Sequence, residues 1–121
     1  MRLELFSGRD ERLAIVLESD RLLVTLRGKA DEGFLARLLE DLHQEALTRH
    51  LSGVALDLSA LEPLEPAAVK VLIRWAMRQA ELETYERYGI VLKYAGGVAW
   101  QKVSLAAIAH LCPYVRLEPI A

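Results

Sequence analysis

The chain has 121 residues, with 15 lysines and arginines against 17 aspartates and glutamates and a formal net charge of -2. This length suits a single domain, 1-121, and the single Cys112 excludes an internal disulfide framework. A hydrophobic share of 53% excludes a disordered chain, and the interspersed charges lack the basic excess of a nucleic-acid-binding protein.

Three strands are predicted at the start of the chain, at residues 2-6, 12-18 and 21-27. The second and third contain nearly continuous apolar runs, which are typical of strands in a sheet covered by helices. Ser19 and Asp20 supply turn chemistry between them. We therefore expect these two strands to form an antiparallel hairpin.

Helices then alternate with strands. The first predicted helix covers 32-49, because Asp31 can cap it and apolar residues recur with helical spacing. Pro66 suits the first turn of a second helix, at 66-87, since its missing N–H costs nothing there. The remaining predicted elements are strands at 54-58, 90-94 and 114-117 and a helix at 99-111 that Pro113 ends.

The order of the elements is therefore β-β-β-α-β-α-β-α-β. Strand–helix–strand units join parallel strands through right-handed crossovers, whereas the hairpin is antiparallel. The sequence thus predicts an α/β fold with a mixed central sheet and about three helices.

The middle of the chain resembles a known family. Residues 54–75, VALDLSALEPLEPAAVKVLIRW, are similar to the central motif of the STAS domain, the fold of bacterial anti-sigma-factor antagonists. In that motif a hydrophobic strand ends in Asp-Leu-Ser, and a loop leads through an acidic residue to a leucine-rich helix. Here Val54 to Ser59 match the strand, and Glu65 stands where the family has Asp. The segments LVTLRGKAD and GIVLKYAGG extend the resemblance to about residues 12 to 118.

The resemblance implies a STAS-like module of bacterial signalling that binds another protein, with no catalytic activity and no cofactor. In regulatory members of the family, a kinase phosphorylates a serine that follows the acidic residue. This chain has Pro66 there, so we expect no phosphorylation at that position. Ser59 is the nearest hydroxyl, and we interpret it as a turn-forming residue.

The same resemblance places partner binding on the loop 59-66 and the helix after it. The partner would be an anti-sigma-like ATPase or kinase, a larger signalling complex, or a membrane transporter that this chain serves as an accessory subunit. A homodimer through the same surface remains open, and nucleic acid is not expected. The predicted partner-binding residues are Leu61, Leu64, Glu65, Pro66, Lys70, Val71, Arg74, Trp75 and Arg78.

Two questions stay open at this stage. Trp75 suits either the edge of the core or an aromatic anchor on a partner surface. A small-ligand-binding or enzymatic domain, with a cleft near Asp57 and Glu65, is the alternative to a binding module, although no catalytic constellation accompanies these carboxylates.

Metal binding and export are not expected. The soft metal ligands lack the closely spaced pairs of a structural zinc site; they are His43, His50, His110 and Cys112. No apolar run is long enough to span a bilayer, and the first residues carry charges where a signal peptide needs an apolar stretch. We therefore expect a cytoplasmic location.

Overall fold

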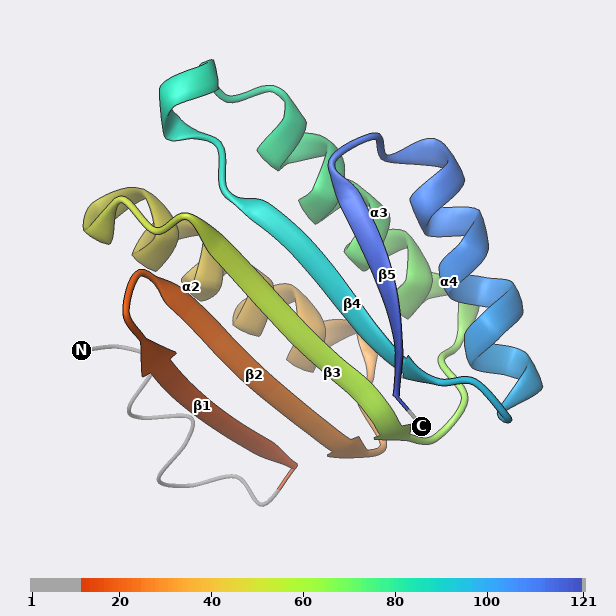
Figure 1. The fold of residues 1–121 in the computed structure, drawn as a ribbon. Helices are drawn as coiled ribbons and strands as arrows, with labels where there is room; N and C mark the ends of the chain where they lie inside the picture. Colours follow the sequence, from red (N-terminus) through yellow and green to blue (C-terminus); the bar gives the residue numbers. More distant parts are fainter. Residues whose placement is uncertain (1–11, 121) are drawn as a thin grey trace.

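One mixed sheet of five strands, in the order β1-β2-β3-β4-β5, forms the centre of the computed structural model, which describes residues 12–120 (Figure 1). The strands are β1 (Leu13–Glu18), β2 (Arg21–Gly28), β3 (Gly53–Leu61), β4 (Gly89–Ala95) and β5 (Val115–Ile120). The helices are α2 (Glu32–Arg49), α3 (Pro66–Ala80) and α4 (Ala99–Leu111), with a short 3-10 turn, η1 (Thr84–Glu86). The strand expected at 2-6 lies outside the described residues.

The pairing of the strands confirms the predicted mixed sheet. β1 pairs antiparallel with β2, whereas β2, β3, β4 and β5 run parallel to one another. Each crossover moves the chain one strand further in the same direction. Because such crossovers are right-handed, all three helices lie on one face of the sheet. Figure 1 shows this arrangement, with the uncovered face of the sheet turned toward the viewer.

The core lies between that sheet and the helices. Alternate residues of the three inner strands, such as Leu22, Leu56 and Leu92, are at most 1% exposed and face the helices. The apolar stripe predicted for α2 is fully buried against them; it consists of Phe34, Leu35, Leu38, Leu39, Leu42 and Ala46. Within residues 12–120, no helix is both long and apolar enough to cross a bilayer.

Three predicted boundaries were wrong, and the first is the end of β5, which continues to Ile120 rather than stopping at residue 117. β3 continues to Leu61 rather than ending at residue 58, because Gly28 and Leu61 extend its pairing with β2. α3 ends at Ala80 rather than at residue 87, and the guanidinium of Arg87 donates to the carbonyl of Ala80 over 3.0 Å. The chain leaves the helix early because Tyr88, which is 0% exposed, packs in the core against side chains of α2 and α3.

The junction between β2 and α2 sets the start of the loop that leads to α3. Gly28 has φ +75°, a left-handed conformation that glycine adopts without steric cost, and its carbonyl accepts from the amide of Glu62 over 2.8 Å. Three residues later Asp31 caps α2, as predicted, by accepting from the amide of Phe34 over 2.8 Å. The two contacts fix the loop after β3 beside the start of α2.

β5 forms one margin of the sheet. The amide of Ile90 donates to the carbonyl of Tyr114 over 3.5 Å, so along β5 the backbone groups of Arg116 and Glu118 face β4. The backbone groups of Leu117 and Pro119 therefore face outward, and Pro119 has no N–H to offer there.

Candidate functional site

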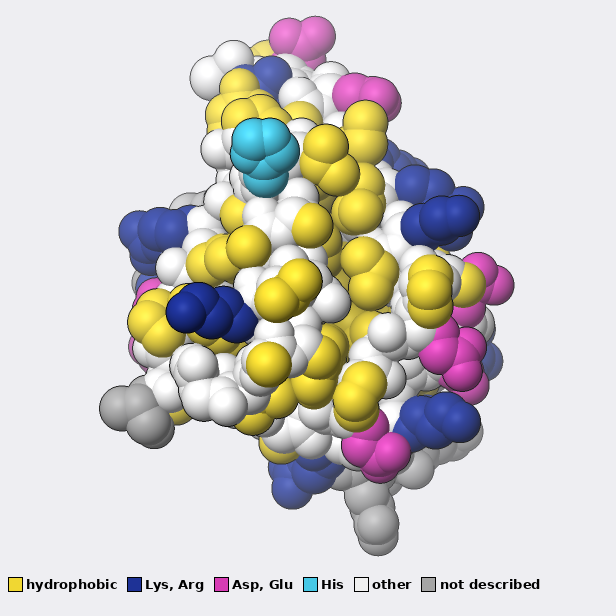
Figure 2. Space-filling view, turned by 90° about the vertical axis from the view of Figure 1, so that its right-hand side faces the viewer, with side chains coloured by type: hydrophobic (Ala, Val, Ile, Leu, Met, Phe, Trp, Pro, Cys, Tyr) yellow, Lys and Arg dark blue, Asp and Glu magenta, His cyan; other side chains and the backbone are white. Residues whose placement is uncertain are grey.

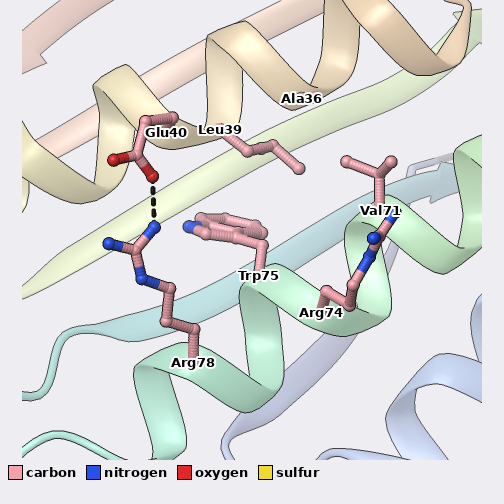
Figure 3. A pocket seen from close by; sticks show the side chains of 7 residues that line it. All are labelled: Ala36, Leu39, Glu40, Val71, Arg74, Trp75 and Arg78. Carbon is pink, nitrogen blue, oxygen red and sulfur yellow. Dashed lines mark hydrogen bonds and ion pairs between the residues drawn. The ribbon is translucent and has the colours of Figure 1, made fainter.

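A groove of about 200 Å³ runs between α2 and α3 (Figure 3). Apolar side chains and the Trp75 indole line its floor, and charged side chains lie along its sides. Its lining residues are Ala36, Leu39, Glu40, Val71, Arg74, Trp75 and Arg78. Four of the lining residues, all on α3, are among those predicted to bind a partner. The other three lie on α2 and were not predicted.

The exposed part of the predicted surface lies at the start of α3 and along one side of it. Leu64 is half-buried, whereas the side chains that reach solvent are Glu65, Pro66, Lys70, Arg74 and Arg78. Lys70, Arg74 and Arg78 follow each other at four-residue spacing, which places them in one row on the helix. Met77, 51% exposed, adds an apolar contact beside this row, and its i+3 spacing from Arg74 could have identified it.

Three of the predicted contact residues are buried in this chain. Leu61, Val71 and Trp75 are 6%, 5% and 5% exposed and belong to the chain's own core. Leu61 is buried because β3 extends through it, and the other two are buried because their side of α3 packs toward α2. Val71 and Trp75 therefore form the floor of the groove and do not project as anchors. The core-edge interpretation of Trp75 is the one that its burial supports.

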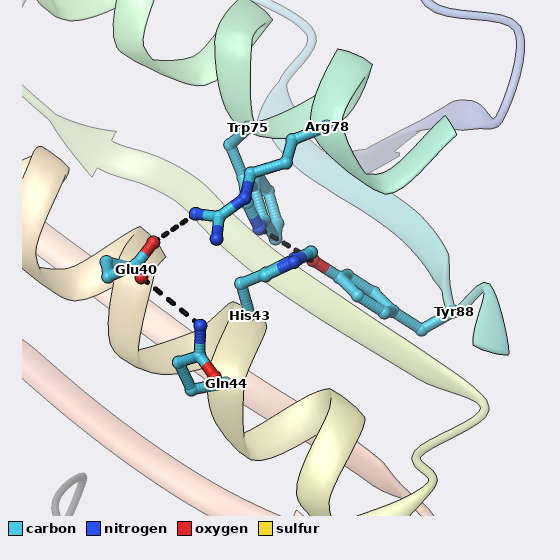
Figure 4. A network of polar contacts seen from close by, with 6 residues as sticks. All are labelled: Glu40, His43, Gln44, Trp75, Arg78 and Tyr88. Carbon is cyan, nitrogen blue, oxygen red and sulfur yellow. Dashed lines mark hydrogen bonds and ion pairs between the residues drawn. The ribbon is translucent and has the colours of Figure 1, made fainter. Parts of the chain in front are cut away.

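Trp75 belongs to a buried chain of hydrogen bonds (Figure 4). Its indole N–H donates to the Tyr88 hydroxyl oxygen over 2.9 Å, and that oxygen lies 2.7 Å from Nδ1 of His43. Because the indole can only donate, the Tyr88 hydroxyl keeps its own hydrogen for Nδ1 of His43. This arrangement satisfies all three groups when His43 is neutral and carries its hydrogen on Nε2.

Burial keeps the side chains of this hydrogen-bond network neutral. Desolvation lowers the pKa of His43, and the nearby Arg78 charge lowers it further, while Glu40 opposes the change. Desolvation likewise raises the pKa of Tyr88 above the range of physiological pH. The network therefore joins α2, α3 and the residue before β4 without any buried charge.

An exposed ion pair closes the groove above this network. Arg78 donates to Glu40, which also accepts from the amide of Gln44 over 3.2 Å. The hydrogen bond from Arg78 is the main cause that lowers the pKa of Glu40. Since both partners are almost half exposed, solvent screening leaves this pair little net effect on stability. Its contribution is to hold two side chains across the groove.

The start of α3 has the geometry predicted for it. Glu65 occupies the N-cap position, where its carbonyl accepts from the amides of Ala68 and Val69, and Pro66 is the first helical residue. The carboxylate of Glu65 makes no capping hydrogen bond. Ser59 lies within β3 rather than in a turn, and its amide and hydroxyl both donate to Asp57, over 3.0 and 2.6 Å.

The two carboxylates of the enzymatic alternative have different surroundings. One oxygen of Asp57 accepts both hydrogen bonds from Ser59, and Glu65 is exposed at the helix start. Within residues 12–120, no group of three or more His, Cys, Asp or Glu side chains is placed to hold a metal ion. Asp57 therefore has a local structural role.

Solved structures share this architecture. The chain is similar to an anti-sigma factor antagonist from Mycobacterium paratuberculosis, with a TM-score of 0.58 and 17% identity over 86% of this chain and 83% of the other. It is similar to a serine-to-glutamate variant of RsbS from Moorella thermoacetica, with a TM-score of 0.67 and 22% identity over 92% of this chain and 89% of the other.

An uncharacterised protein with a SpoIIAA-like fold from Shewanella loihica gives a TM-score of 0.57 and 13% identity, over 89% of this chain and 83% of the other. No protein-family model matches the sequence, and a search of curated proteins finds no relative. These structural similarities, together with the mixed sheet and its three helices, show that the chain has the STAS fold, the fold of the anti-sigma-factor antagonists.

Proposed function

We propose that this chain is a cytoplasmic, non-catalytic module that regulates a bacterial signalling protein by binding it through α3. The observation that carries the proposal is the row formed by Lys70 and Arg74, two exposed cations for which the described part of the chain provides no ion-pair partner. They lie beside the groove whose floor is apolar. The fold shared with anti-sigma-factor antagonists supports the same function.

The chemistry of this surface indicates an acidic partner. Unpaired cations on an exposed helix attract a negatively charged protein and speed its approach. Met77 and the groove floor then supply apolar area that a partner side chain can cover. We infer that the partner is an ATPase or kinase of the anti-sigma type or a larger signalling complex, with an acidic face that meets α3.

The start of α3 offers the proposed module no site for a phosphorylation switch. Pro66 is the first helical residue and has no hydroxyl, so a kinase cannot phosphorylate it. The hydroxyl of Ser59 is held by Asp57. We infer that binding is controlled by the partner or by the amount of this protein, and not by phosphorylation at the start of α3.

Charge reversal on α3 tests the proposal. We expect a Lys70→Glu/Arg74→Glu variant to fold but to lose its partner in affinity purification from the native host, because the cations that steer the partner become repulsive. Mass spectrometry would compare the proteins recovered with the wild type and with the variant. The same samples should show no phosphate on residues 59–68.

The matched control is Lys29→Glu/Lys102→Glu, which makes the same change of net charge at two exposed sites outside α3. A protein that is lost equally with both variants would reflect net charge alone and would contradict a binding surface on α3. Recovery of a membrane transporter would assign the accessory-subunit alternative. A wild-type dimer in light scattering that Lys70→Glu/Arg74→Glu converts to a monomer would assign the homodimer.

A further inference from the structure

A second hollow, of about 260 Å³, lies near the N-terminal ends of β3 and β4, well away from the α2–α3 groove. We propose that it binds a small organic anion in which a phosphate or carboxylate is attached to a planar group. Its lining residues are Arg21, Ser52, Gly53, Val54, Gly89, Ile90, Val91, Tyr114 and Arg116. The lining contains two arginines and no carboxylate, so the charge that it presents is positive.

Two glycines lie at the floor of this hollow, Gly89 exposed and Gly53 buried under the Arg21 side chain. Gly53 and Gly89 are paired directly across from each other on β3 and β4. A Cβ at Gly53 would lie 3.5 Å from Nε of Arg21, which places the missing side chains of this pair on the face that bears Arg21. That is the face without helices, because Arg21 is exposed while its neighbour Leu22 is buried in the core. Paired glycines within a sheet let another group approach the backbone closely.

The two arginines approach the floor from neighbouring strands on either side. Arg21, on β2, lies over Gly53 and has no ion-pair partner within residues 12–120. Arg116, on β5, has a pair with Glu118 at 3.9 Å, but the two side chains are 75% and 49% exposed, so this pair competes weakly with an added anion. Arginine forks match phosphate and carboxylate oxygens with two hydrogen bonds.

Tyr114 adds a neutral donor at the same end. Its hydroxyl oxygen accepts from Arg87 over 2.8 Å, and the Arg87 guanidinium lies 4.5 Å from the centre of its ring. The hydroxyl hydrogen has no acceptor in the described part of the chain and can be donated to a ligand. The hollow therefore combines a flat floor for a planar group with donors for an anionic one, which is the chemistry of an aryl phosphate or aryl carboxylate.

Titration of the full chain with three probes separates these two contributions. Phenyl phosphate carries both the flat group and the charge, inorganic phosphate carries only the charge, and phenol carries only the ring. In two-dimensional amide NMR spectra we expect phenyl phosphate to shift the Gly53 and Gly89 resonances saturably. Inorganic phosphate should bind about tenfold more weakly, and phenol should leave both resonances unchanged.

Arg21→Gln and Arg27→Gln provide a matched pair, since both remove one exposed arginine from opposite ends of β2. We expect Arg21→Gln to weaken phenyl phosphate binding about tenfold and Arg27→Gln to leave it unchanged. Gly53→Val, with its fold checked by circular dichroism, should abolish the shift of the Gly89 resonance by filling the floor. The proposal is overturned if neither glycine resonance shifts saturably, or if Arg27→Gln weakens binding as much as Arg21→Gln.

Discussion

The buried contact between three side chains from different elements is the most specific residue-level feature of this protein. His43 and Trp75 meet at the hydroxyl of Tyr88, and each is at most 5% exposed. Each hydrogen bond satisfies a polar atom that would otherwise be buried without a partner. Removal of one of these polar groups is therefore expected to lower the free energy of unfolding by more than the net contribution of one hydrogen bond, because its partners stay buried without one.

Removal of the Tyr88 hydroxyl measures this cost. Tyr88→Phe leaves the indole N–H of Trp75 and Nδ1 of His43 buried without partners, so we expect a loss of about 3 kcal/mol in the free energy of unfolding. Urea denaturation followed by Trp fluorescence would report it. Tyr85→Phe is the control, because Tyr85 is 84% exposed, and it should change stability by less than about 0.5 kcal/mol. Equal losses would contradict a structural role for the network.

At the scale of the elements, the N-termini of α2 and α3 are capped differently, although an acidic residue precedes both helices. Asp31 and Glu65 both occupy N-cap positions. The shorter side chain of Asp31 bends back to the amide of Phe34, whereas the carboxylate of Glu65 makes no capping hydrogen bond. Pro66 already removes one of the unpaired amides of α3, which reduces the need for a cap there.

Alanine substitutions at these two positions should therefore differ. We expect Asp31→Ala to cost about 1 kcal/mol, because the amide of Phe34 loses its acceptor. Glu65→Ala should cost less than about 0.5 kcal/mol, since only a screened interaction with the helix dipole is lost. Thermal unfolding of both variants at the same pH would decide. A larger loss for Glu65→Ala would show that its carboxylate stabilises α3 more than its geometry indicates.

The sequence predicts the elements better than the places where they end. Hydrophobic spacing, Asp31 and Pro66 correctly predicted the three helices and the hairpin, since these signals are local. The end of α3 depends on Tyr88 being held between α2 and α3, and that contact is not local. The same limit explains Val71 and Trp75, which helical spacing places equally well in a core or on a surface. The pair Gly53 and Gly89 is invisible until the register of β3 and β4 is known.

At the scale of the whole molecule, Figure 2 shows hydrophobic side chains gathered on a face turned by 90° from the uncovered sheet. The most exposed large apolar side chains of α3 and α4 are Met77, Val103 and Leu111, at 51%, 71% and 59% exposed. The basic row on α3 and the arginine-lined hollow on the sheet are separate surfaces. The proposed protein-binding surface and the proposed anion site therefore lie on different faces of the molecule.

Global stability should depend on pH through His43. The unfolded histidine titrates near pH 6.5, whereas burial lowers the pKa of the folded one, so the unfolded chain binds more protons below about pH 6.5. Arg78 adds to this shift and Glu40 opposes it. We therefore expect the free energy of unfolding to fall as the pH is lowered from about 7 to about 5.

Denaturation across this range would compare three proteins. His43→Gln should show a flatter pH dependence than the wild type, because the group that must be protonated is gone. His110→Gln, on the exposed end of α4, should keep the dependence of the wild type. Parallel curves for the wild type and His43→Gln would contradict a buried neutral histidine.

Pro119 limits how a strand of another chain can pair with the β5 edge of the sheet. An incoming strand that tried to lengthen the sheet beyond β5 would find no amide hydrogen at the outward-facing position of Pro119. The ladder would be interrupted before it was complete. Edge-to-edge pairing of copies, the first step toward insoluble fibres, is thereby disfavoured along β5. Contacts with other chains at this edge then depend on side chains rather than on backbone hydrogen bonds.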